Sequence, residues 1–157
     1  MIYRAIGVMS GSSLDGLDVA FVSFEENRGA WSYQIVAATT YNYSEAWLRK
    51  LQQASSLSAY DYLQLHSEYG RLIGEQINAF INKYNLHHQV QLIASHGHTV
   101  FHAPENGFTA QIGCGAAIAA LTGINVVSDL RAMDVALNGQ GAPIVPVGEK
   151  LLFSSYN

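Results

Sequence analysis

Apolar residues in the first forty positions fall into three short runs separated by small or polar residues. Residues 2–9 form an apolar run that is typical of a buried strand. Further strands are predicted over residues 17–24 and 31–41, with the polar segment 25–29 as the turn between them. Three consecutive strands with short connections predict an antiparallel beginning to a mixed sheet.

The middle of the chain has helical spacing instead. Ser44 is placed to cap a helix over residues 45–54, and Ser58, with Asp61 three residues later, marks the start of a longer helix. Large, mostly apolar residues then recur every three or four positions, at Tyr62, Leu65, Tyr69, Leu72, Ile73, Gln76, Ile77, Phe80 and Ile81. This stripe predicts a helix that packs on the sheet, with its aromatic residues in the core.

Strands and helices alternate in the rest of the chain. Buried strands are predicted over residues 90–95, 108–112 and 124–128, and helices over residues 115–121 and 147–153. Gly123 is placed to close the first of these helices, and Pro146 lies in the first turn of the second. The order of elements predicts an α/β fold with helices on the faces of the sheet.

Composition narrows the class of protein. The 157 residues suit one domain, and charged residues make up 13% against about 25% in typical proteins, which suggests that part of the surface is covered by something else. The net charge of −4 and the lack of a basic cluster argue against nucleic acid as a partner. A single cysteine, Cys114, excludes an internal disulfide. With no signal peptide and no membrane-spanning run, we expect a cytoplasmic setting without membrane contact.

The segment between the first two strands carries candidate chemistry. Residues 10–18 read Ser-Gly-Ser-Ser-Leu-Asp-Gly-Leu-Asp. Small residues let a backbone approach a ligand and aim its N–H groups at an anion, the serine hydroxyls add donors, and Asp15 and Asp18 are carboxylates of the kind that hold Mg²⁺. The same residue types form ordinary turns, so the pattern alone leaves phosphate binding and a plain turn both open.

Polar residues also follow two of the buried strands. His96 and His98, directly after residues 90–95, are predicted to share one face, and with Asp129 and Asp134 they allow a metal-dependent hydrolase as one alternative. Against this, no further ligand lies at metal-binding spacing. Asp129 and Arg131 follow the strand at 124–128, where α/β sheets bind ligands, and a buried ion pair between them is the structural alternative.

Several blocks carry a resemblance to a known family. Residues 7–18, Gly-Val-Met-Ser-Gly-Ser-Ser-Leu-Asp-Gly-Leu-Asp, closely resemble the opening signature of the anhydro-N-acetylmuramic acid kinases, in the sugar kinase, actin and Hsp70 superfamily. The likeness continues, in the family's order, at Ser95–Val100, Gln111–Gly113, Val126–Arg131 and Asn138–Pro146. Several ordered blocks are far more specific than any single loop.

The resemblance implies a ribonuclease H-like (actin-like ATPase) domain with a mixed sheet, three antiparallel strands first and helices on both faces. It implies an ATP- and Mg²⁺-dependent kinase that opens 1,6-anhydro-N-acetylmuramic acid and phosphorylates it for cell-wall recycling. The residues that would bind ATP phosphates are Gly11, Ser12, Ser13, Leu14, Asp15, Gly16, Leu17 and Asp18. Asp15 would hold Mg²⁺, directly or through water. The residues that would contact the sugar are His96, Thr99, Asp129 and Arg131.

The chain also departs from the family pattern. His98 stands where the family has Gln, which is not an exchange expected of a metal ligand, and Ala132 and Met133 stand where the family tends to carry arginines. The family's Phe-Asp-x-Gly-Pro-Gly-Asn motif, with its general-base aspartate, is expected beyond Asn157. The chain is therefore expected to be an amino-terminal lobe that is inactive alone. A noncatalytic nucleotide- or sugar-binding domain is the main alternative, and the sequence leaves a homodimer open.

Overall fold

The computed structural model describes residues 1–142 and 144–153, which contain one mixed six-stranded sheet. The first three strands, β1 (Ile2–Ser10), β2 (Leu17–Asn27) and β3 (Ala30–Tyr41), are antiparallel as predicted. The turn between β2 and β3 is narrower than the predicted 25–29. Arg28 and Gly29 alone form it, with φ of 53° and 86°. Two residues with positive φ match the twist of the strands, so pairing continues up to the turn.

The other half of the sheet is organised around one long strand, β4 (Leu92–Ala103). It runs parallel to β1 and, at its start, to β6 (Val126–Val127), while its second half pairs antiparallel with β5 (Phe108–Ile112). The predicted strand end at Ser95 is wrong, because β4 continues through the polar residues that follow. The predicted strand over 124–128 is reduced to two residues. The strand order is β3-β2-β1-β4-β5, with β6 beside β4.

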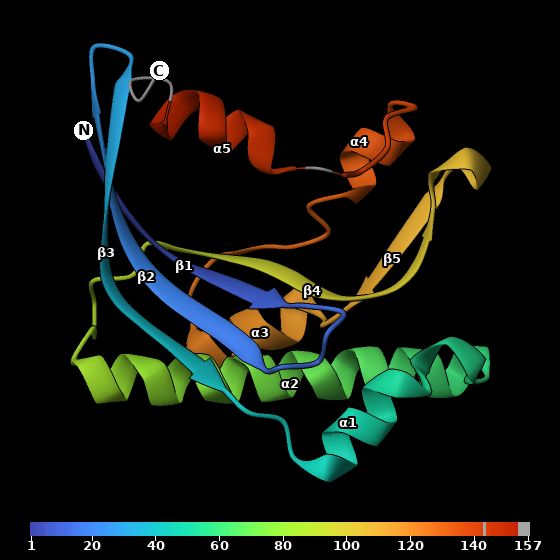
Figure 1. Ribbon diagram of the computed structural model, residues 1–157. Helices are drawn as coiled ribbons and strands as arrows, with labels where there is room; N and C mark the ends of the chain where they lie inside the picture. Colours follow the sequence, from blue (N-terminus) through green and yellow to red (C-terminus); the bar gives the residue numbers. More distant parts are fainter. Residues whose placement is uncertain (143, 154–157) are drawn as a thin grey trace.

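Helices cover both faces of the sheet, as predicted (Figure 1). On one face lie α1 (Glu45–Gln52), α2 (Ala59–Tyr84) and α3 (Gly115–Thr122), and on the other lie α4 (Ala132–Ala136) and α5 (Val145–Leu152). Short 3-10 turns follow α1 at 54–56 and β4 at 104–106. The predicted caps are confirmed: the hydroxyl oxygens of Ser44 and Ser58 accept N–H bonds in the first turns of α1 and α2, and Gly123 closes α3 with φ of 69°. The helix α4 is too short to show periodicity in the sequence.

The core lies between the sheet and α2. Side chains of β1 and β2 alternate, so that Ile6, Val8, Leu17, Val19 and Phe21 are buried on the side of α2. They meet the predicted stripe of that helix, of which Tyr69, Ile73, Ile77 and Phe80 are fully buried. The opposite face of the same strands is exposed at Gly7, Met9 and Asp18. One face of the sheet is thus filled by α2, and the other is left open toward α4 and α5.

Two glycines bring α2 close to α3. A Cβ on Gly70 would lie 2.6 Å from the carbonyl oxygen of Cys114 and 2.7 Å from its backbone nitrogen, and a Cβ on Gly74 would lie 3.0 Å from a methyl group of Leu121. Backbone atoms cannot move aside as a flexible side chain can. Gly70 is therefore required by the approach of α3, although glycine weakens a helix by itself.

We predict that Gly70→Ala lowers the free energy of unfolding by about 1–3 kcal/mol, the usual cost of overpacking a tight contact. Gly148 of α5 is the matched control, since no atom lies within 4 Å of its hypothetical Cβ. Gly148→Ala should raise the free energy of unfolding by up to about 1 kcal/mol through helix propensity. Denaturant unfolding of both variants measures the difference, and equal effects of the two changes would contradict the close approach.

Candidate active site

The loop between β1 and β2 begins with a turn and rejoins the sheet through residues with positive φ. The backbone N–H of Leu14 donates to the carbonyl oxygen of Gly11 (3.2 Å), and Leu14 has φ of 60°. Gly16 has φ of 150° and lies against the end of β3, where a Cβ would be 2.7 Å from a methyl carbon of Thr40. Only glycine fits there. The turn bond at Gly11 and the close packing of Gly16 therefore fix both ends of the loop, and Ser12 and Ser13 between them are exposed.

Three polar residues of this loop are left free within the described part of the chain. Ser12, Ser13 and Asp15 are exposed and make no hydrogen bond or ion pair with residues 1–142 or 144–153. By contrast, Leu17 is buried in β2, and the Oδ1 atom of Asp18 accepts a hydrogen bond from the Thr40 hydroxyl (2.5 Å). Hydroxyl and carboxylate groups are thus available to a ligand chiefly at Ser12, Ser13 and Asp15.

A second cluster forms around Arg131, just before α4. Its Nε–H donates to Nε2 of His96 (2.9 Å), and its Nη1 donates to the carbonyl oxygen of Gly141 (2.8 Å). The backbone N–H of Gly141 in turn donates to Oδ2 of Asp134 (2.6 Å). These bonds hold the glycine-rich segment 139–141 beside β4.

The protonation of His96 follows from its partners. Its Nδ1–H donates to the carbonyl oxygen of Gly97 (3.0 Å), which leaves the Nε2 lone pair for Arg131. Burial and, to a smaller extent, the positive charge of Arg131 lower the pKa of His96 below its ordinary value. The imidazole is therefore neutral at neutral pH and orients the guanidinium group.

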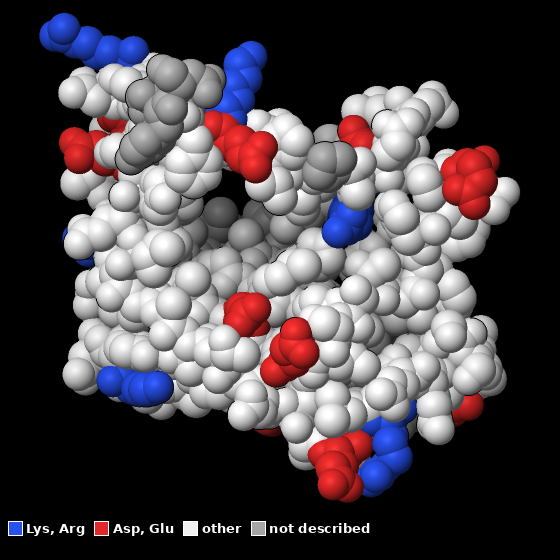
Figure 2. All heavy atoms as spheres, in the orientation of Figure 1, with Lys and Arg blue, Asp and Glu red and all other residues white. Residues whose placement is uncertain are grey.

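The loop and the Arg131 cluster meet at one cavity of about 260 Å³ on the face of the sheet opposite α2. The residues that line it are Met9, Ser10, Ser12, His96, Thr99, His102, Arg131 and Ala142. Figure 2 shows this side of the molecule hollowed between the sheet and the part that carries α4 and α5. Ser12 belongs both to the loop and to the cavity, so the two candidate sites adjoin.

Comparison with known proteins shows the family of this chain. The family model for anhydro-N-acetylmuramic acid kinase matches residues 3–157. The chain belongs to this family. It is 40% identical to an anhydro-N-acetylmuramic acid kinase of Shewanella pealeana over 159 aligned positions, which cover 97% of this chain and 42% of that protein. The chain thus spans about two fifths of the length of this curated relative. Among the described helices, none has the length and apolar character needed to cross a bilayer.

The structure brings most of the family's predicted sugar contacts together. His96, Thr99 and Arg131 all line the cavity, but Asp129 does not. Asp129 is exposed, with φ of 55°, and its charge adds to burial in raising the pKa of Tyr62. Within the described residues it forms no ion pair with Arg131, so the alternative of a buried pair is wrong.

His102 also lines the cavity, although no role is predicted for it from the sequence. Its Nδ1 lies 3.1 Å from the hydroxyl of Thr109 in β5. The pairing of β4 with β5 shifts register between Thr99 and Phe101. Six positions separate His102 from His96 within β4, an even number, so simple alternation along the strand was a signal that could have placed both on one face.

His98 points away from this cavity, so the prediction that it shares a face with His96 is wrong. Gly97 between them has φ of 71°, and the register of β1 against β4 shifts at the same point. His98 instead lies with Nδ1 3.1 Å from Ser10 Oγ and with its ring nearly perpendicular to that of Tyr69 of α2, the ring centroids being 6.5 Å apart. Across residues 1–142 and 144–153, no three His, Cys, Asp or Glu side chains gather in a way that could hold a metal ion.

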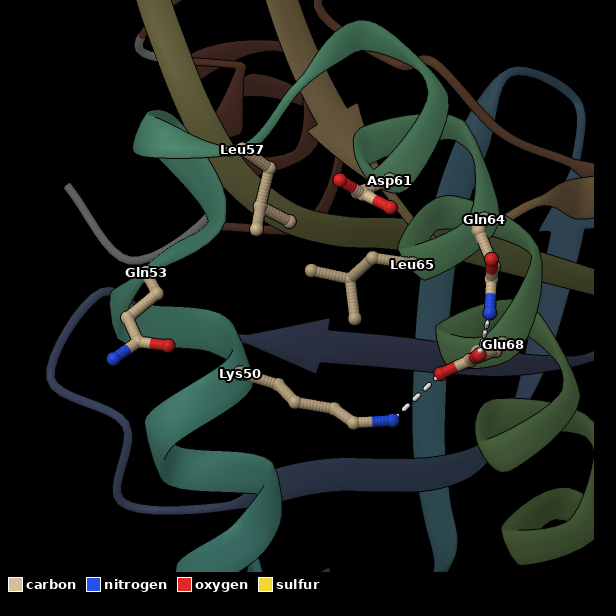
Figure 3. Close-up of a pocket in the computed structure, with 7 residues that line it drawn as sticks. All are labelled: Lys50, Gln53, Leu57, Asp61, Gln64, Leu65 and Glu68. Atoms are coloured by element: carbon tan, nitrogen blue, oxygen red, sulfur yellow. Dashed lines mark hydrogen bonds and ion pairs between the residues drawn. The ribbon is translucent and has the colours of Figure 1, made fainter.

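A second cavity, of about 270 Å³, lies between α1 and α2 (Figure 3). The Nζ atom of Lys50, the one cation among the described residues that line this cavity, is 2.6 Å from Oε2 of Glu68. This bond, with one from Gln64, lowers the pKa of the Glu68 carboxyl group. Asp61 adds a second carboxylate to the lining. Because its cation is already paired, this cavity is poorly suited to an anionic ligand, and no residue of the family signatures lines it.

We predict that the free energy of unfolding falls as pH is lowered from about 6.5 to about 5, a range in which histidine titrates. The folded-state pKa of His96 lies below the ordinary value of 6.5, so the unfolded chain takes up the proton first. Stability is full above pH 6.5 and is lost as pH falls toward the folded-state pKa.

His96→Asn should flatten this dependence without abolishing it, because burial also lowers the pKa of His98. Urea unfolding at a series of pH values measures both slopes. Parallel curves for the wild type and the variant would contradict the buried, neutral state of His96.

Proposed function

We propose that the protein carrying this chain is an ATP- and Mg²⁺-dependent kinase acting in the cytoplasm. It would add water to 1,6-anhydro-N-acetylmuramic acid at the anomeric carbon and transfer the γ-phosphoryl group of ATP to the freed oxygen on carbon six. The products would be N-acetylmuramic acid 6-phosphate and ADP, in cell-wall recycling. The main observation in support of this proposal is that Ser12 belongs both to the loop 11–16, whose serine hydroxyls are unpaired within the described residues, and to the lining of the polar cavity.

The loop would bind the phosphates of the nucleotide. Ser12 and Ser13 offer free hydroxyl and N–H donors, on a turn whose ends are fixed by Gly11 and Gly16. Asp15 is exposed beside them as an oxygen ligand of the type that Mg²⁺ prefers. When bound, ATP supplies the phosphoryl group and Mg²⁺ neutralises phosphate charge. Phosphoryl transfer depends chiefly on such positioning and charge stabilisation.

The cavity would bind the sugar. Arg131 uses its Nε–H and one Nη1–H for His96 and Gly141, and its other guanidinium hydrogens remain for a sugar hydroxyl or the lactyl carboxylate. Within the described part of the chain, the hydroxyl of Thr99 accepts only a long bond from Gln111 Nε2 (3.5 Å), so it too is available. Asp129 would take part as an exposed acceptor outside the cavity lining.

Residues 1–157 would form the amino-terminal lobe of a two-lobed kinase. They would supply the first phosphate loop and part of the sugar site. The aspartate that activates water is expected outside them, so this chain alone should bind without turnover. That division fits the 42% of the relative's length that the chain matches.

The deciding experiment is an assay of the natural full-length protein with ATP, Mg²⁺ and 1,6-anhydro-N-acetylmuramic acid, read by mass spectrometry of the sugar. We expect a product heavier by one water and one phosphoryl group, and none from residues 1–157 alone. Ligand binding without any product would favour a noncatalytic binding domain. Stoichiometric zinc in the purified protein would favour a hydrolase.

We predict that Asp15→Asn in the full-length protein lowers kcat by roughly 100-fold, the scale of losing one charge-stabilising contact in the transition state. Glu45→Gln is the matched control, since it removes an exposed carboxylate on α1 whose pair with Arg49 is also exposed. Its kcat should stay at the wild-type value. Unchanged turnover of Asp15→Asn would remove the metal role from that residue.

A further inference from the structure

A continuous chain of buried and half-buried hydrogen bonds lies directly beneath the loop. The hydroxyl of Ser10, the last residue of β1, accepts a hydrogen bond from the Tyr43 hydroxyl (2.8 Å) and lies 3.1 Å from Nδ1 of His98. The Tyr43 hydroxyl also lies 2.5 Å from that of Tyr69. The four residues come from β1, the connection between β3 and α1, α2, and β4.

Most protons in this chain can be assigned by counting. Each hydroxyl has one hydrogen to donate. Because Tyr43 gives its hydrogen to Ser10, the short bond between the two tyrosines is donated by Tyr69. The Ser10 oxygen can accept a second bond, so counting leaves the direction of the Ser10–His98 bond open. We assign the Ser10 hydrogen to Nδ1 of His98, which places the His98 proton on Nε2. The order of donation is Tyr69 to Tyr43 to Ser10 to His98.

Burial makes this chain uncharged and costly to break. Tyr69 is fully buried, and Ser10 and His98 are 2% and 6% exposed. Burial raises the pKa of both tyrosines and lowers the pKa of His98, so all members are neutral at neutral pH. A buried polar group that loses its partner is strongly disfavoured. Each member therefore holds its neighbour in place.

The hydrogen-bond chain joins the sheet at the two places where the candidate site begins, next to the loop 11–16 and next to His96. Ser10 is paired with Leu17 of β2 and with His98 of β4, and residues 11–16 leave the sheet immediately after it. The register of β1 against β4 shifts between Val8 and Ser10, at the turn through Gly97 that sends His96 to the opposite face. Ser12 and His96 each lie two residues from a member of the chain.

We propose that the hydrogen-bond chain Tyr69–Tyr43–Ser10–His98 is a positioning element that sets the loop 11–16 and His96 relative to each other. Tyr43 and Tyr69 act through Ser10 and His98, from the α2 side of the sheet, without touching a ligand themselves. The effect on activity rests on the proposed kinase function. The effect on loop geometry does not.

The test compares Tyr43→Phe with Tyr84→Phe in the full-length protein. Tyr43→Phe keeps the ring but removes the donor to Ser10 and the acceptor for Tyr69. Tyr84→Phe is the matched control, since its hydroxyl contacts Thr39 and Ala38 of β3 at the far end of α2. We expect Tyr43→Phe to raise the KM for Mg·ATP roughly fivefold, the factor for a hydrogen bond of ordinary net strength, with a smaller change in kcat. Tyr84→Phe should change neither.

Hydrogen exchange separates this inference from the proposed function. Amides of residues 11–16 and 96–97 should exchange faster in Tyr43→Phe than in the wild type or in Tyr84→Phe, whether or not the protein is a kinase. An active wild type whose Tyr43→Phe variant keeps the wild-type KM and exchange rates would overturn the positioning role. An inactive wild type with faster exchange in the variant would overturn only the kinase proposal.

His98, the last member of this hydrogen-bond chain, allows a rescue experiment and has a spectroscopic signature. His98→Gln keeps an acceptor for Ser10 and should retain wild-type exchange, whereas His98→Leu removes the acceptor and should speed it. Long-range ¹H–¹⁵N spectra of the wild type should show His98 protonated on Nε2. A proton on Nδ1, or equal exchange in the Gln and Leu variants, would overturn the proposed order of donation.

Discussion

The rest of the structure depends on the packing of α2 against one face of the sheet. This helix of 26 residues covers β1 and β2 with Tyr69, Ile73, Ile77 and Phe80, all fully buried. Burial of that much apolar surface is the main favourable term available to a domain of this size. Because one face is used for stability, the other is free to carry exposed polar residues, and the cavity lies there.

The parallel pairing of β1 and β4 then determines where the site forms. The carboxyl ends of parallel strands meet at one edge of a sheet, so the loop after Ser10 and the turn at Gly97 lie next to each other although 87 positions separate them in the sequence. The shift in register at that edge turns His96 toward Arg131 and His98 toward Tyr69. Two histidines with similar sequence surroundings therefore have different tasks, one in the cavity lining and one in the buried support.

Much of this arrangement could be predicted from local sequence patterns. The stripe of α2, the caps at Ser44 and Ser58, and the three antiparallel strands follow from periodicity and capping chemistry, and the structure confirms them. Local patterns could not predict three other features. These are the length of β4, the separation of His96 from His98 and the exposed position of Asp129. They depend on bulges and positive-φ residues that only the pairing of distant strands selects.

We propose that nucleotide phosphates and sugar bind on either side of Ser12. The most direct measurement is a crystal structure of the full-length protein with a non-hydrolysable ATP analogue, Mg²⁺ and the anhydro sugar. We expect phosphate oxygens within hydrogen-bond distance of residues 11–16 and sugar oxygens against His96, Thr99 and Arg131. Ligand density elsewhere, such as in the cavity around Lys50 and Glu68 between α1 and α2, would contradict it.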